Sequence, residues 1–244
     1  MSEIEIRTED GSCDAYVASP AGDGPFPAAL FFMDGVGLRP ALRKMADRVA
    51  ALGYYVLLPN LYYRVGAYEP FDAGSVFSGG PEMARLMKIA ETANDAAVAR
   101  DTNAFFAHLE SEPRARRGKI ACFGYCLGGG LAMRMACELP ERFSVAASFH
   151  GGRFLVTPEA PAMLAAKARA ELYVGIAEKD TRHTPEVTEK LQDALTAANV
   201  PHTLEVYPGA AHGFAVEDLP VYDRISSERH WARLRTLLER AARR

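Results

Sequence analysis

The sequence is poor in cysteine and lacks the cysteine spacings of a metal site or a disulfide framework. Its four cysteines include no CxxC pair. The N-terminal stretch MSEIEIRTEDGS is acidic and polar, unlike a secretory signal peptide. We therefore interpret the cysteines as reduced thiols, predict a cytoplasmic location, and expect neither a metal ion nor another cofactor.

Neither sign of charge is in excess, and no apolar run is long. The 28 basic and 31 acidic residues give a formal net charge of -3, so the electrostatic signature of a nucleic-acid-binding protein is missing. No apolar run approaches the roughly 18 residues that a membrane span requires. We expect no nucleic-acid or membrane partner. The 49% hydrophobic content is that of a globular protein rather than a disordered chain.

Short apolar segments alternate with helical patterns along the chain. Strands are predicted at residues 28–33, 54–59, 119–125, 144–150, 171–176 and 202–207, and helices at 40–53, 81–112 (in one or two pieces), 127–139, 184–199 and 221–242. Strands that are apolar throughout are typical of a parallel sheet covered on both faces. The prediction is a single α/β domain over residues 1–244, with a mostly parallel sheet of about seven to eight strands and helices on both faces.

A long connection interrupts this alternation. Residues 60–80 contain glycine, proline and five aromatic residues: Tyr62, Tyr63, Tyr68, Phe71 and Phe77. Such a segment is either a lid over a pocket or a packed surface loop. As a lid or insertion it would extend over about residues 60–90.

The strongest local pattern is Gly124-Tyr125-Cys126-Leu127-Gly128, between a predicted strand and a predicted helix. It has the form of a nucleophile elbow, with cysteine where serine is commoner. A nucleophile on a sharp turn needs small neighbours two residues away, and a helix N-terminus favours the thiolate. The amide of Leu127 would be free to bind an oxyanion. The competing interpretation is a buried structural thiol with glycines that ease packing.

A nucleophilic cysteine needs a base and an orienting acid. His212 follows the last predicted strand, and Asp180 follows the strand before it, so both are expected at the same sheet edge as Cys126. The order nucleophile, acid, histidine is that of an α/β-hydrolase. Glu178 is a rival acid. His150 ends a strand at this edge and could line the pocket. We interpret His108 and His202 as structural residues, and His183 and His230 as surface residues.

On these residues the sequence resembles the dienelactone hydrolase (carboxymethylenebutenolidase-like) family. The matching segments are ALFFMDGVGLRP, GYYVLLPNLYYR, GKIACFGYCLGGGLA, GIAEKDT and PGAAHGF. The resemblance implies an α/β-hydrolase fold and a triad of Cys126, His212 and Asp180. It also implies cofactor-free hydrolysis of small lactones or esters through a thioester, with Gly35 as the second oxyanion-hole amide.

Two positions depart from the family pattern. Asp34 stands where the family usually has a glutamate that interacts with the resting thiol, so it is the expected thiol-modulating acid. Val216, followed by Glu217 and Asp218, replaces an arginine that holds the substrate carboxylate in the family. We therefore predict a preference for neutral esters or lactones. The candidate pocket residues are Tyr62, Tyr63, Arg85, His150 and Arg153; Phe71 could add an aromatic wall, and Arg64 is a further arginine that could reach a substrate carboxylate.

Two alternatives remain open from the sequence. A cysteine elbow also occurs in redox-sensing and amidotransferase-type proteins, although the nearby histidine usual there is missing. A non-catalytic binding protein on a hydrolase fold is the other. The expected partner is a small ester or lactone, and the expected assembly is a monomer or small homo-oligomer.

Overall fold

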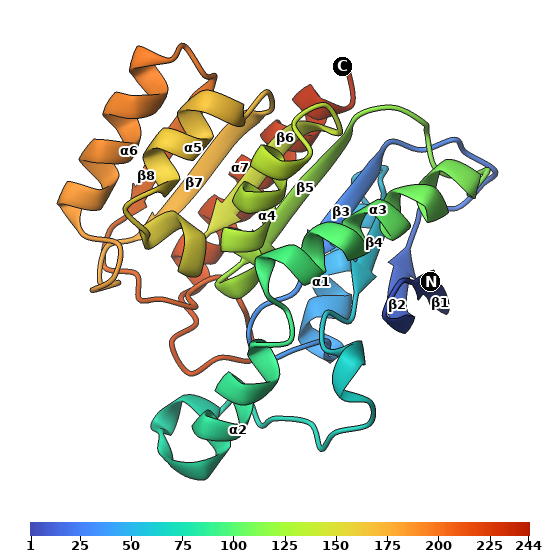
Figure 1. Cartoon of the computed structure of the whole chain (residues 1–244), viewed down its shortest axis with the longest axis horizontal. Coiled ribbons are helices and arrows are strands. Elements are labelled where there is room, and N and C mark those ends of the chain that lie inside the picture. The colour runs from blue at the N-terminus through green and yellow to red at the C-terminus, as the bar shows by residue number, and fades with distance from the viewer. The chain divides into compact units, whose positions relative to one another are not determined.

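The computed structural model describes residues 1–244 and divides into two units (Figure 1). The first unit comprises residues 1–117 with 218–220, and the second comprises residues 118–217 with 221–244. The chain has eight strands, and the strand pairs within the units are mostly parallel. The predicted α/β class is confirmed, whereas the single domain stays a prediction.

Four strands form the sheet of the first unit, in the order β1-β2-β4-β3. β3 (Ala28–Phe32) and β4 (Tyr55–Pro59) are fully buried and parallel, as predicted. β1 (Ser2–Thr8) and β2 (Gly11–Ala18) form an antiparallel hairpin that we did not predict, and β2 also pairs antiparallel with β4. In β1 exposed polar residues alternate with buried ones, so it lacks the continuous apolar run of the central strands.

Two helices of the first unit begin at recognisable sequence signals. Pro40 occupies the first turn of α1, and the Asn94 side chain accepts a hydrogen bond from the Ala97 amide at the start of α3. The helical pattern over 81–112 is confirmed as two helices. The elements are α1 (Pro40–Ala50), α2 (Gly80–Ala90) and α3 (Asp95–Ser111), with single 3₁₀ turns at Tyr63–Val65 and Val76–Ser78.

The second unit contains a fully parallel sheet in the order β5-β6-β7-β8. Its strands are β5 (Ile120–Tyr125), β6 (Phe143–Phe149), β7 (Glu171–Ala177) and β8 (His202–Tyr207). The carboxyl ends of parallel strands meet at one sheet edge. Four polar residues follow these four ends: Cys126, His150, Asp180 and His212.

Helices cover both faces of this parallel sheet. α4 packs on β5 and β6, and α7 packs on β6 from the other side, behind the sheet in Figure 1. The helices of the unit are α4 (Leu127–Glu138), α5 (Ala160–Lys167), α6 (Pro185–Ala197) and α7 (Arg224–Ala241), with a 3₁₀ turn at Arg153–Val156. In neither unit does a helix combine the length and apolar character needed to cross a bilayer.

Two histidines that we predicted at the surface are buried, so that prediction is wrong. His183 is 6% exposed and His230 is inaccessible. His230 lies on the buried face of α7, where its Nδ1 donates to the Ser227 carbonyl (2.6 Å) and its Nε2 is 2.7 Å from the Tyr125 hydroxyl. Residues 227, 230, 231 and 234 share that face at helical spacing, and this spacing is the sequence signal that identifies His230 as buried.

Candidate active site

Cys126 lies on a sharp turn between β5 and α4. Its backbone has φ 52° and ψ -114°, in the positive-φ region that side-chain-bearing residues rarely adopt. Such a conformation costs about 1–3 kcal/mol and persists only where the surroundings enforce it. The Cys126 amide donates to the Phe149 carbonyl (3.2 Å), and the Cys126 carbonyl accepts from the Gly152 amide (3.1 Å). The elbow is thus fixed to the end of the neighbouring strand.

The glycines around Cys126 are required by close backbone contacts. A Cβ at Gly124 would lie 2.3 Å from the backbone of Gly128. A Cβ at Gly130 would lie 2.4 Å from the Gly152 carbonyl oxygen. No Cβ fits at these distances, so the elbow glycines let the helix start pass close to β5 and to the loop after β6.

Cys126 is the only one of the four cysteines that is not buried. Burial raises the pKa of the thiols of Cys13 and Cys122, and it raises the pKa of Cys137 to about 12. The thiolate is the reactive form of cysteine. Accessibility therefore distinguishes Cys126 from the other thiols of the chain.

His212 joins Asp180 to Cys126. Its Nδ1 is 2.5 Å from Asp180 Oδ2, and Cys126 lies close enough to influence the pKa of the ring. Burial opposes the charge on His212, but the hydrogen bond to Asp180 and the interaction with Cys126 outweigh it and raise the pKa of His212 to about 9. Burial likewise disfavours the Asp180 carboxylate, yet His212 and Arg182 hold the pKa of Asp180 well below its usual value.

Glu178, the alternative acid, binds the backbone at Gly209. Glu178 is exposed, and its Oε2 accepts a hydrogen bond from the Gly209 amide at 2.7 Å. Asp180, in contrast, has a side chain that is only 4% exposed and lies against His212. Of the two acids, Asp180 is therefore the one positioned to orient the histidine.

Arg182 is a site residue that sequence analysis missed. Its Nη2 is 2.8 Å from Nδ1 and 3.2 Å from Nε2 of His212, so the guanidinium lies against the imidazole ring. The Arg182 amide also donates to Asp180 Oδ1 (3.1 Å). The Arg182 side chain is 56% exposed. Its position two residues after Asp180, in the loop that follows β7, is the signal that could have identified it.

The arginines that we considered instead have other partners. In the first unit, Arg64 pairs with Asp10 and Asp101. Arg85 pairs with Glu82, and its guanidinium lies 3.9 Å from the centre of the Phe71 ring. In the second unit, Arg153 opens the 3₁₀ turn after β6 with φ 49°. The assignment of Arg85 and Arg153 to a substrate pocket stays a prediction.

His150 packs directly against the ring of His212. The ring centroids are 5.2 Å apart in an edge-to-face arrangement, and Phe214 contacts the His150 ring at 5.3 Å. His150 is 2% exposed, and neither of its ring nitrogens has a hydrogen-bond partner. Burial, followed by the neighbouring His212 and His230, lowers the pKa of His150 well below its usual range. His150 is therefore a neutral ring packed against His212.

Tyr62 and Tyr63, two of the predicted pocket residues, lie in the first unit. The Tyr62 side chain is inaccessible, and its hydroxyl donates to the Gly35 carbonyl (2.8 Å). The Tyr63 hydroxyl bonds to Asp101 (2.8 Å). Tyr62 thus fixes the backbone at Gly35 rather than forming an open wall.

Leu127, at the first position of α4 in the second unit, has an amide without an acceptor inside the helix. That Gly35 and Leu127 form one oxyanion hole stays a prediction.

Asp34, the predicted thiol-modulating acid, is bound by an arginine. Both of its carboxylate oxygens accept from Arg39, at 2.7 and 2.9 Å, and one also accepts from the Val36 amide. Arg39 in turn donates twice to Asp218. These bonds assign Asp34 a role in bracing the loop after β3, and an interaction with the thiol stays a prediction. No group of three or more His, Cys, Asp or Glu side chains is arranged to hold a metal ion.

Comparisons with known proteins agree with this fold and geometry. The sequence profile of the dienelactone hydrolase family matches residues 13–242. Two curated relatives bear the name "Putative carboxymethylenebutenolidase". The one from Synechocystis is 27% identical over 97% of this chain and 95% of its own, and the one from Azospirillum brasilense is 30% identical over 88% of each.

Solved structures show the same fold. A structure titled as a putative dienelactone hydrolase from Klebsiella pneumoniae superposes with a TM-score of 0.82 at 23% identity, covering 98% of this chain and 97% of its own. The dienelactone hydrolase-like promiscuous phosphotriesterase P91 from metagenomic libraries gives a TM-score of 0.78 at 20% identity, over 98% of both chains. The α/β-hydrolase fold is therefore established.

Proposed function

Because the chain belongs to the dienelactone hydrolase family, whose members are carboxylic-ester or lactone hydrolases, we propose that it hydrolyses small esters or lactones with Cys126 as nucleophile. The observation that supports the proposal is the position of His212, which is hydrogen-bonded to Asp180 and lies close enough to Cys126 for the two side chains to interact. An acid, a base and an accessible thiol in this order form the set of groups that acyl transfer requires.

The proposed reaction has two steps. His212, whose pKa is raised to about 9, holds the proton of the Cys126 thiol, and the thiolate sulfur attacks the substrate carbonyl carbon. The tetrahedral intermediate then expels the alcohol, which receives that proton, and a thioester remains. In the second step His212 deprotonates a water molecule that attacks the thioester, releasing the acid and restoring the thiol. Asp180 keeps the Nδ1 proton of His212 in place, so that Nε2 serves as the base.

Charge on the substrate oxygen must be stabilised in both steps. The Leu127 amide opens α4, where the helix dipole also favours negative charge. We propose this amide as one oxyanion donor and the Gly35 amide as the other. The Tyr62 hydroxyl, bonded to the Gly35 carbonyl, would keep the backbone at Gly35 in place without contacting the substrate.

The nucleophile is tested with Cys126→Ala and hydrolysis of p-nitrophenyl acetate. We expect kcat to fall by about a thousandfold or more, because only binding and oxyanion stabilisation remain. The wild-type protein should gain one acyl group on the peptide that contains Cys126, as located by mass spectrometry.

Cys137→Ala is the matched control, since this thiol lies buried in α4, the helix that follows Cys126. It should retain wild-type turnover. An acyl group on another cysteine, or full activity in Cys126→Ala, would contradict the proposal. A thiol that forms a stable sulfenic acid and no acyl adduct would support the redox alternative, and an inert thiol would support the binding protein.

A further inference from the structure

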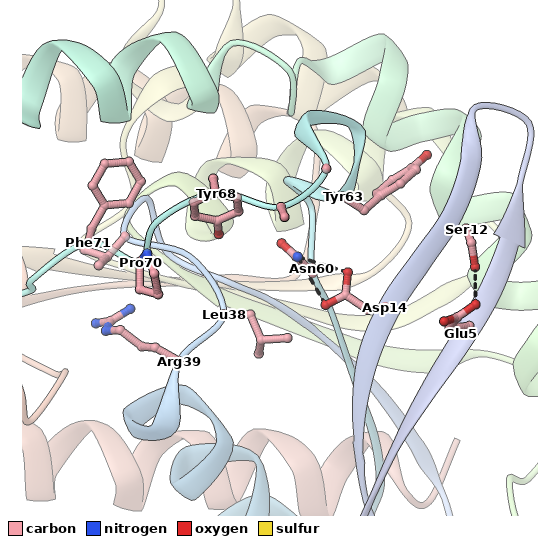
Figure 2. Close-up of a pocket in the computed structure, with 13 residues that line it drawn as sticks. Glu5, Ser12, Asp14, Leu38, Arg39, Asn60, Tyr63, Tyr68, Pro70 and Phe71 are labelled. Atoms are coloured by element: carbon pink, nitrogen blue, oxygen red, sulfur yellow. Dashed lines mark hydrogen bonds between the residues drawn. The ribbon is translucent and has the colours of Figure 1, made fainter.

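A groove in the first unit is lined by residues that the proposed reaction does not use (Figure 2). It lies among the middle of β1, the first half of β2, the loop after β3 and the segment 60–71. Its volume is about 450 Å³, which is within the range of small-molecule sites. Figure 2 shows Asp14 and Asn60 in its middle, with Tyr68 and Phe71 toward one end and Glu5 with Ser12 at the other.

The one basic residue that lines the groove has no donor left for a ligand. A guanidinium carries five N–H groups. Those of Arg39 donate twice to Asp34, twice to Asp218 and once to the Gly37 carbonyl, over distances of 2.7 to 3.2 Å. Two carboxylates also offset its single charge. Arg39 therefore cannot recruit an anion into the groove.

The two acidic residues that line the groove, Glu5 and Asp14, have no charged partner, in contrast to Arg39. Glu5 accepts from the Ser12 hydroxyl (2.8 Å), and Asp14 accepts from the Asn60 side-chain amide (3.0 and 3.2 Å). Both donors are neutral, so neither carboxylate is paired with a cation. The part of the groove around Glu5 and Asp14 therefore carries two carboxylates without a paired cation, and these keep unused acceptor positions.

Aromatic rings line one end of the groove. The rings of Tyr68 and Phe71 are 6.0 Å apart and tilted by 40°. Burial raises the pKa of Tyr68, the negative charge of Asp14 raises it further, and Arg85 opposes both. The faces of aromatic rings attract cations. One such contact already exists, since the Arg85 guanidinium lies over Phe71.

From these observations we infer that the groove binds a small organic cation, an ammonium group attached to an apolar body. The ammonium lies against the Asp14 carboxylate and the Tyr68 ring, and the apolar body packs on Leu38 and Pro70, which also line the groove. A carboxylate beside an aromatic face is the combination that recognises alkylated ammonium groups. The inference involves no covalent step and does not depend on the proposed hydrolysis.

Isothermal titration calorimetry with benzyltrimethylammonium chloride tests the inference. We expect saturable binding of one probe molecule, at least about tenfold tighter than that of benzyl alcohol or sodium benzoate, because cation–aromatic and carboxylate attraction are then both present. Asp14→Asn and Tyr68→Leu should each weaken binding by about fivefold or more. Binding should persist in Cys126→Ala, so that it fails or succeeds separately from the hydrolase proposal.

Asp23→Asn is the matched control, because Asp23 is an exposed aspartate of the same unit that does not line the groove. Its affinity for the probe should equal that of the wild type. The inference is overturned if the probe gives no saturable heat, if benzoate binds as tightly, or if Asp14→Asn binds like Asp23→Asn. Circular dichroism of each variant excludes loss of fold as the cause.

Discussion

The interactions of His212 with Asp180 and Cys126 make this residue a source of pH-dependent stability. The pKa of His212 is raised from 6.5 to about 9 by the net effect of Asp180 and Cys126 over burial. A raised pKa in the folded state stabilises the fold fully below about pH 6.5, and this contribution is lost as the pH rises toward 9. Its size is at most about 3 kcal/mol.

We therefore expect His212→Gln to lower the free energy of unfolding at about pH 6 and to have little effect near pH 9. Urea denaturation of both proteins across this range measures the difference. His202→Gln is the control, since His202 is bonded to Gln192 and the Val200 carbonyl away from the triad. A His212→Gln deficit that stays constant or grows with pH would contradict the prediction.

His150 supplies a second residue-scale prediction. Its two ring nitrogens are buried without partners, and a buried polar group of this kind costs about 1–3 kcal/mol. His150→Phe keeps an aromatic ring against His212 and Phe214 while it removes the polar atoms. We expect its melting temperature to rise by several degrees, which corresponds to an increase of about 1 kcal/mol or more in the free energy of unfolding.

The comparison variant is His150→Asn, which keeps a buried polar group and should not be stabilised. A melting temperature of His150→Phe at or below that of the wild type would show that the ring nitrogens do have partners. Because the His150 ring contacts His212, turnover is measured on the same samples. A stabilised variant with reduced kcat would support the predicted placement of His150 at the pocket.

Sequence reasoning predicts where a residue lies when its position depends on the strand that it follows. Cys126, Asp180 and His212 each follow a recognisable strand, and the structure brings them together. Arg182 and His150 were harder, because their contacts with His212 depend on how the loops after β6, β7 and β8 pack, which no local pattern specifies. The same holds for Asp34, whose partner Arg39 is itself held by Asp218, 179 positions further along the chain.

At the scale of elements, the elbow depends on the contact between β5 and α4. A Cβ at Gly124 would lie 2.3 Å from backbone atoms of Gly128, and backbone cannot move aside as a flexible side chain would. We expect Gly124→Ala to destabilise the fold by about 2 kcal/mol or more, as strongly overpacked core variants are. Turnover should fall as well, because the position of Cys126 shifts with α4.

Gly74→Ala is the control, since this exposed glycine has ordinary φ and the added Cβ would lie 3.4 Å from the Asp72 carboxylate, in van der Waals contact. Its unfolding midpoint in urea should stay close to that of the wild type. Equal midpoints for Gly124→Ala and Gly74→Ala would show that the elbow tolerates a side chain and that its geometry is not enforced by close packing.

Elements with continuous apolar runs were predictable, and those with mixed surfaces were not. The strands that became β3 to β8 were all predicted to within a few residues. The β1–β2 hairpin was missed because one face of β1 is exposed and carries charged residues. α5 was also missed, since APAMLAAK is short and apolar without clear periodicity. Helix and strand cannot be distinguished by pattern in such segments.

At the scale of the whole molecule, the alternation of strands and helices specified the fold class, because parallel strands need crossover connections. The distribution of charge around the site was harder to predict from the sequence. The predicted preference for neutral substrates rested on Val216, Glu217 and Asp218. In the structure the Asp218 carboxylate is bonded to Arg39, so part of the expected repulsion is cancelled. Arg182 adds a positive charge beside His212.

We therefore expect a carboxylated butenolide to be hydrolysed at least as efficiently as its methyl ester. Arg182→Gln should lower kcat/KM for the free acid by about tenfold and for the methyl ester by less than about twofold, because only the acid uses the guanidinium charge. Arg169→Gln is the control, an exposed arginine of the same unit bonded only to backbone carbonyls.

The salt dependence of kcat/KM tests the effect of the Arg182 charge independently. The Arg182 side chain is 56% exposed, so its attraction for an anion is screened at an ionic strength where the Debye length falls to about 3 Å. At about 1 M sodium chloride the advantage of the free acid in the wild type should shrink toward the Arg182→Gln value. Equal losses for both substrates in Arg182→Gln, without salt dependence, would mean that Arg182 acts through Asp180 and His212 on the reaction itself. The neutral-substrate prediction would then stand.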